Sequence, residues 1–105
     1  MSLPELFETV TAKVKTSPAL PLTEDLKLKL YGMFKRATVG TTTESGETAP
    51  SMFNIVGKKK WIAWVACDEM TQEESMLGYV KIVAGIDCDL GRETTELLND
   101  FESKQ

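Results

Sequence analysis

The chain has 105 residues, 42% of them hydrophobic and 27% charged, which is the composition of one ordinary globular domain. Its net charge of −4 disfavours a broad nucleic-acid interface, because such an interface needs many cations on one face. No apolar run is long enough to span a membrane, and the first residues lack the basic start and apolar core of a signal peptide. We therefore expect a cytoplasmic protein without stable membrane insertion and without a nucleic-acid partner.

The first two helices are predicted from apolar spacing and from capping residues. A helix over about residues 3–15 is indicated by apolar side chains that recur every three or four residues: Leu3, Leu6, Phe7, Val10 and Val14. Ser2 and Glu5 have the spacing of a capping box ahead of it. Thr23 can cap a second amphipathic helix, which Gly40 is expected to end.

The second half of the chain predicts two further helices. Residues 41–56 have no helical period and are predicted to be a connection. A short third helix is expected over about 58–67, and Thr71 and Glu74 form a second capping-box pattern that opens the fourth helix. This fourth helix is predicted to be the longest and to run to about residue 88.

The tail, residues 89–105, has a weaker apolar pattern and is predicted to be either a short fifth helix or a frayed end. No segment alternates with the period of a strand. The sequence thus predicts an all-α fold with four main helices.

The residues needed for common catalytic and metal chemistry are missing. The chain has no histidine, so Ser/His and Cys/His nucleophile pairs cannot form. Cys67 and Cys88 are far apart, without the spacing of zinc ligands, and are predicted to be reduced thiols. We expect a non-catalytic protein that needs neither a metal nor a cofactor.

Aromatic and basic residues gather in the middle of the chain. Residues 31–64 carry five Lys or Arg against two Glu, a local balance of +3, whereas the remainder sums to 7 minus 14, or −7. Aromatic planes and ammonium groups on separate helices suit a small ligand that has both a ring and phosphates.

Each of these residues also has a purely structural interpretation. Tyr31, Phe34 and the tryptophans Trp61 and Trp64 can all be core residues, because aromatic side chains at helical spacing usually are. Lys35 and Arg36 near a helix C-terminus can simply complement the helix dipole. Only Lys58, Lys59 and Lys60, at a helix N-terminus where positive charge is unfavourable, support a functional role as strongly as a structural one.

Three segments resemble the acyl-CoA-binding protein family. Residues 30–40, with the sequence LYGMFKRATVG, are similar to its YxxYKQATxG motif, and residues 57–64, GKKKWIAW, to its GKAKWxAW segment. Tyr79 and Val80 resemble a tyrosine–aliphatic pair that follows the second tryptophan by fifteen residues. The resemblance covers about residues 3–88.

The resemblance implies an up-down-down-up four-helix bundle that binds, buffers and transports medium- and long-chain acyl-CoA as a monomer. By match to the family motifs, Tyr31, Lys35, Lys60 and Tyr79 hold the CoA head group. Phe34 replaces a tyrosine but keeps a ring that can stack on adenine. Residues 1–88 are expected to form the acyl-CoA-binding domain and residues 89–105 a C-terminal extension.

The acyl-chain site and two other functions stay open. Six apolar residues of the first two helices can line an acyl-chain groove or equally belong to the core: Leu6, Phe7, Val10, Leu28, Leu30 and Met33. The alternative function is a helical interaction module whose basic segments bind an acidic protein or an anionic membrane surface. A thioesterase is disfavoured because no nucleophile–base pair is recognisable.

Overall fold

The computed structural model describes residues 1–105 as six α-helices without strands, and the prediction of an all-α fold is confirmed. The helices are α1 (Leu3–Thr16), α2 (Glu24–Thr38), α3 (Thr42–Ser45), α4 (Ile55–Val65), α5 (Gln72–Ala84) and α6 (Asp89–Ser103). None of them has both the length and the apolar character that a membrane span requires.

The predicted capping residues begin three of the helices. Both predicted capping boxes form: in each, the hydroxyl accepts from a backbone N–H and the glutamate accepts from the cap's own N–H, at Ser2 with Glu5 and at Thr71 with Glu74. Thr23 accepts from the N–H of the third residue after it and so caps α2. Local side-chain chemistry therefore fixes where α1, α2 and α5 start.

Two polar caps within the predicted connection change its interpretation. Thr41 and Glu44 form a third capping box, which opens the one-turn helix α3. The side chain of Asn54 accepts from the N–H of Gly57 at 3.0 Å, so α4 begins at Ile55 rather than near residue 58. Apolar spacing does not predict either helix start, because the capping side chains carry the signal there.

The predicted end of the fourth helix was wrong, and the extra helix predicted as one alternative for the tail is present but longer than expected. α5 ends at Ala84, is 13 residues long, and is shorter than α2 and α6, which have 15 residues each. α6 is neither short nor frayed. One of its faces is buried through Leu90, Thr94, Leu98 and Phe101. The polar Thr94, whose buried hydroxyl has no hydrogen-bond partner, interrupts the apolar stripe and weakened its sequence signal.

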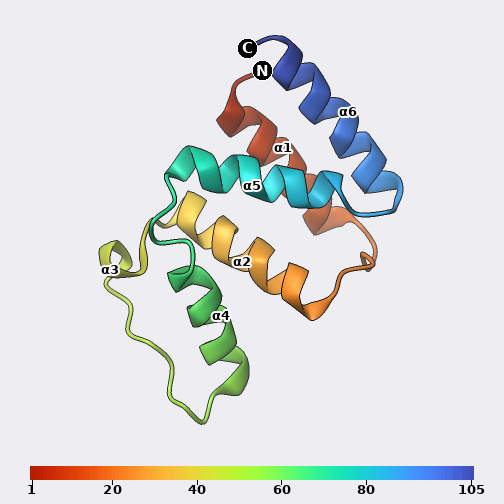
Figure 1. The fold of residues 1–105 in the computed structure, drawn as a ribbon. Helices are drawn as coiled ribbons and strands as arrows, with labels where there is room; N and C mark the ends of the chain where they lie inside the picture. Colours follow the sequence, from red (N-terminus) through yellow and green to blue (C-terminus); the bar gives the residue numbers. More distant parts are fainter.

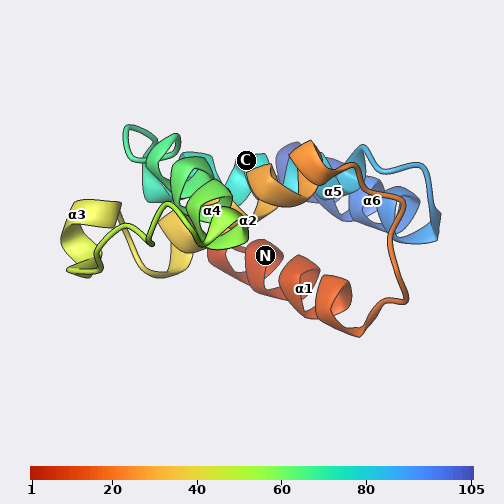
Figure 2. The same cartoon turned by 90° about the horizontal axis from the view of Figure 1, so that it is seen from below.

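The four main helices follow the up-down-down-up order. Figure 1 shows α1 and α5 running in one sense and α2 and α4 in the other. α2 packs against α4 on one side and α5 on the other, while α6 packs against α5 and α1. Seen from below, α3 and α4 lie at one end of the molecule and α6 at the other (Figure 2). α2 and α5 therefore connect the two ends.

The core lies among α1, α2, α5 and α6. Leu6, Val10, Val80 and Val83 are completely buried, and α6 contributes apolar side chains to the same cluster. α4 is held separately, by the buried Trp64, whose indole Nε1 donates to the carbonyl of Gly40 at 2.9 Å. This bond fixes α4 to the end of α2, the helix that carries most of the predicted site residues.

Candidate functional site

An aromatic cluster joins three helices at one face of the bundle. The ring of Tyr79 on α5 meets Phe7 of α1 edge-on at a centroid distance of 5.4 Å, and Phe34 of α2 lies 6.1 Å from Phe7. Burial raises the pKa of Tyr79 above the ordinary value of 10.0, so its hydroxyl stays protonated at neutral pH. Tyr79 makes no side-chain hydrogen bond within the protein and borders an open cavity, so its hydroxyl is available as a donor to a ligand.

The cavity beside this cluster has a volume of about 280 Å³ and lies between α1, α2 and α5. Its walls combine basic, hydroxyl, aliphatic and aromatic side chains: Thr11, Val14, Lys15, Leu22, Lys27, Leu30, Tyr31, Phe34 and Tyr79. The structure thus brings the predicted Tyr31, Phe34 and Tyr79 together. Since ligand pockets usually measure about 300–1,000 Å³, this cavity suits one part of a larger ligand.

Three ammonium groups surround Tyr31 without a carboxylate partner. Lys15 and Lys27 line the cavity, and the Lys60 Nζ lies 5.4 Å from the centre of the Tyr31 ring. None of the three takes part in an ion pair. Unpaired cations beside hydroxyl groups form a binding site for phosphate-sized anions.

Lys15 and Lys27 were not predicted from the sequence to be site residues. Lys27 precedes Tyr31 by four residues, so helical spacing places it on the same face of α2 and could have identified it. Lys15 comes from the last turn of α1, and only the packing of α1 beside α2 and α5 brings it to the site.

Lys35 lies one turn beyond Tyr31 and is engaged differently. Its Nζ is 4.5 Å from the centre of the Trp64 ring and 3.5 Å from a carboxylate oxygen of Glu47, and its side chain is only 20% exposed. The neighbouring Arg36 has a structural role, because its Nε donates to the carbonyl of Met70 at 2.9 Å and ties α2 to the α4–α5 turn.

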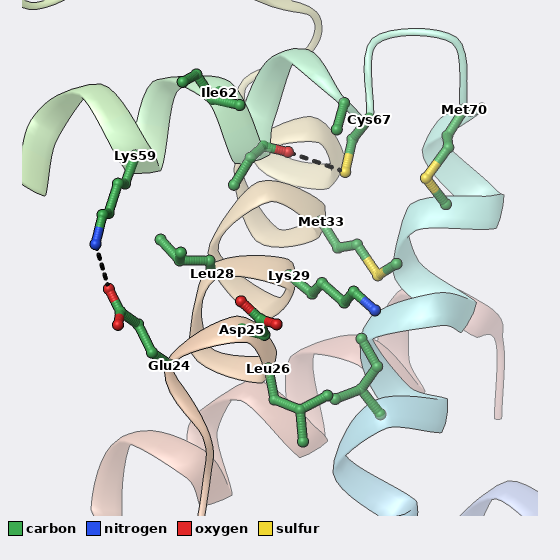
Figure 3. A pocket seen from close by; sticks show the side chains of 13 residues that line it. Glu24, Asp25, Leu26, Leu28, Lys29, Met33, Lys59, Ile62, Cys67 and Met70 are labelled. Carbon is green, nitrogen blue, oxygen red and sulfur yellow. Dashed lines mark hydrogen bonds and ion pairs between the residues drawn. The ribbon is translucent and has the colours of Figure 1, made fainter.

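A larger apolar cavity of about 860 Å³ lies elsewhere, between α2, α4 and α5 (Figure 3). Leu28, Met33 and the free, buried Cys67 line it, and burial raises the pKa of the Cys67 thiol. Met33 is two residues from Tyr31, about 200° around the helix, so this cavity opens on the opposite face of α2. It contains none of the predicted head-group residues.

The six candidate acyl-chain residues therefore separate into three groups. Leu6, Phe7 and Val10 are buried in the core, each at most 3% exposed. Leu30 is also in the core but borders the smaller cavity. Leu28 and Met33 border the larger one.

Residues 4–83 match the family model described as acyl CoA binding protein. The chain belongs to this family. An acyl-CoA-binding protein of Gossypium hirsutum is 46% identical over 80 residues, which cover 76% of this chain and 85% of that protein. An acyl-CoA-binding protein homolog of Caenorhabditis elegans is 38% identical over 77 residues, which cover 73% of this chain and 85% of that protein.

Solved structures of family members share the fold. The crystal structure of Oryza sativa acyl-CoA-binding protein 2 is 37% identical with a TM-score of 0.71, covering 80% of this chain and 87% of its own. A crystal structure of the acyl-CoA-binding protein from Moniliophthora perniciosa is 25% identical with a TM-score of 0.73, and the match covers 98% of this chain and 97% of that one. The predicted four-helix bundle is thereby confirmed, with α6 added to it. These relatives are binding proteins rather than enzymes, in agreement with the predicted absence of catalysis.

Proposed function

We propose that this acyl-CoA-binding protein family member binds medium- and long-chain acyl-CoA esters, and that it buffers and transports them as a cytoplasmic monomer, without a nucleic-acid partner. One observation carries the proposal: Lys15, Lys27, Tyr31 and Tyr79 line one cavity together with aromatic and apolar side chains, and the unpaired ammonium of Lys60 lies over the Tyr31 ring. This arrangement offers separate partners to the phosphates and to the adenine of a CoA head group.

The head group is proposed to lie across α1, α2, α4 and α5. Lys15, Lys27 and Lys60 take its phosphates, since ammonium–phosphate hydrogen bonds are among the stronger ones in proteins. Tyr31 and Tyr79 donate their hydroxyls, and Phe34 offers a ring to adenine. Lys35 is proposed as a further phosphate contact, one turn along α2 from Tyr31.

The acyl chain is proposed to run toward the N-terminal ends of the parallel helices α2 and α4. Leu28 precedes Tyr31 by one turn on α2, and Val56 precedes Lys60 by one turn on α4. Val56 and the adjacent Ile55 are each 64% exposed, and Phe53 just before them is 90% exposed. A covering acyl chain would remove this apolar surface from water, which accounts for large apolar side chains left without protein partners.

The alternative of an interaction module that binds through its basic segments gains no support from the relatives, which are acyl-CoA-binding proteins. Within the basic segment 58–60, Lys59 is paired with Glu24 at 2.9 Å and Lys60 lies over Tyr31. The segment is therefore used within the fold and at the site.

The head-group assignment predicts that Lys27→Gln and Lys60→Gln each weaken binding of a long-chain acyl-CoA by about tenfold, because each removes a charged hydrogen bond to phosphate. The loss should shrink at high salt, where exposed charges are screened. Calorimetric titration measures both effects. Lys81→Gln, on the exposed part of α5, is the matched control and should bind like the parent. If both site variants bind as tightly as Lys81→Gln at every salt concentration, the phosphates bind elsewhere.

A further inference from the structure

Lys35 forms an ion pair with a carboxylate of the protein itself. The carboxylate of Glu47 lies 3.5 Å from its Nζ, and no other carboxylate forms an ion pair with this lysine. The same ammonium lies over the ring of Trp64, at 4.5 Å from the ring centre. Trp64 is itself 1% exposed and hydrogen-bonded to Gly40, so the ring is a fixed support.

The two partners of Lys35 differ in how firmly they are held. Glu47 lies in a segment without helix between Gly46 and Phe53. The hydrogen bonds of this segment stay within it or reach only the adjacent α3 and Asn54. The Lys35–Glu47 pair is the one ion pair that joins the segment to a helix of the bundle. The ammonium is therefore preorganised by Trp64, whereas its counter-ion can leave with little disturbance of the fold.

We propose that Glu47 weakens phosphate recognition by competition: its carboxylate occupies the position on Lys35 that a phosphate of the ligand takes, so that binding exchanges one anion for the other. The inference rests on the proposed function, which assigns Lys35 to the head group. A phosphate monoester such as the 3′-phosphate of CoA carries a charge of about −1.5 to −2 near neutral pH. This phosphate attracts the Lys35 ammonium more strongly than one carboxylate does, and it can therefore displace the carboxylate of Glu47.

Glu47 consequently lowers the advantage that Lys35 gives to a ligand with a phosphate monoester. A ligand that lacks the phosphate monoester leaves Glu47 paired with Lys35 and makes no contact with that lysine. A ligand that carries the phosphate monoester forms an ion pair with Lys35 but first has to break the Lys35–Glu47 pair. Removing the carboxylate of Glu47 should therefore help only ligands that carry the phosphate monoester.

The test compares Glu47→Gln with the parent, using a long-chain acyl-CoA and the same ester of 3′-dephospho-CoA as probes. Glu47→Gln should bind the acyl-CoA about two- to fivefold more tightly at low salt, as expected for loss of one partly exposed competing ion pair. It should bind the dephospho ester like the parent. Glu69→Gln is the matched control, because Glu69 is exposed and forms no ion pair. This substitution changes the net charge by the same amount as Glu47→Gln.

A Lys35→Met background completes the test. There the inference predicts that Glu47→Gln no longer tightens binding. It is overturned if Glu47→Gln behaves like Glu69→Gln with the acyl-CoA, if the gain persists without Lys35, or if the dephospho ester gains as much. A parent protein that binds neither ester would instead overturn the proposed function, so the two failures are distinguishable.

Discussion

Each pair of methylenes added to the acyl chain is expected to tighten binding by somewhat more than tenfold while the added carbons remain buried. Burying one methylene contributes about 0.8 kcal/mol, so a pair contributes about 1.6 kcal/mol, and a tenfold change corresponds to about 1.4 kcal/mol. The apolar surface of Leu28, Ile55, Val56 and Phe53 is the proposed contact for these carbons. Calorimetry on a series of saturated acyl-CoA esters measures the increments.

Two incomplete ligands serve as controls for this series. Free CoA keeps the phosphate and adenine contacts but has no chain, and a free fatty acid keeps the chain but lacks those contacts. Both should bind far more weakly than the long-chain ester, and the increments should stop where the apolar surface ends. Equal affinity for free CoA and the long-chain ester would mean that the protein recognises only the head group.

Phe101→Ala is expected to lower the free energy of unfolding by about 3–5 kcal/mol, the usual cost of truncating a core phenylalanine. Phe101 is 8% exposed and packs in the same cluster as Leu6, Val10 and Val83, which belong to α1 and α5. Urea unfolding measures the change. Glu102→Ala is the matched control, since Glu102 is exposed on the same helix turn and should change stability little.

This prediction also tests the proposed division of the chain at residue 88. A large loss of stability would mean that α6 stabilises the acyl-CoA-binding domain, although the match to the family model ends at residue 83. The folded variant should still bind acyl-CoA, because no residue of α6 lines the cavity proposed for the head group. If Phe101→Ala were as stable as Glu102→Ala, residues 89–105 would be an extension that the domain does not need.

The sequence predicted helices well where apolar spacing and caps agree. Ser2 with Glu5 and Thr71 with Glu74 identified the starts of α1 and α5 because these contacts are local. The extent of α6 could not be predicted in the same way, since Thr94 takes a core position that only packing against α1 and α5 explains. The end of α5 was misplaced because apolar residues such as Ile86 continue past the helix into the turn.

For the site, motif spacing selected Tyr31, Phe34 and Tyr79, and the fold places these three at one cavity. Lys15 was not predicted, because it reaches the cavity through tertiary packing of a helix outside the motifs. The pairing of Lys35 with Glu47 was also beyond the sequence, since it depends on where the irregular segment after α3 returns to α2. Contacts between segments distant in the chain carry no local pattern.

The location of the head group is the central claim, and chemical-shift mapping of the amide resonances during titration with a long-chain acyl-CoA tests it most directly. The proposed function predicts that the largest changes gather around Lys15, Lys27, Tyr31 and Tyr79, which line the smaller cavity, and around Lys60, which lies over the Tyr31 ring. The internal comparison is the part of the larger apolar cavity lined by Met33, Cys67 and Met70, because the proposed path of the acyl chain does not reach these residues. Changes concentrated around that cavity, with Tyr31 and Tyr79 unaffected, would contradict the claim.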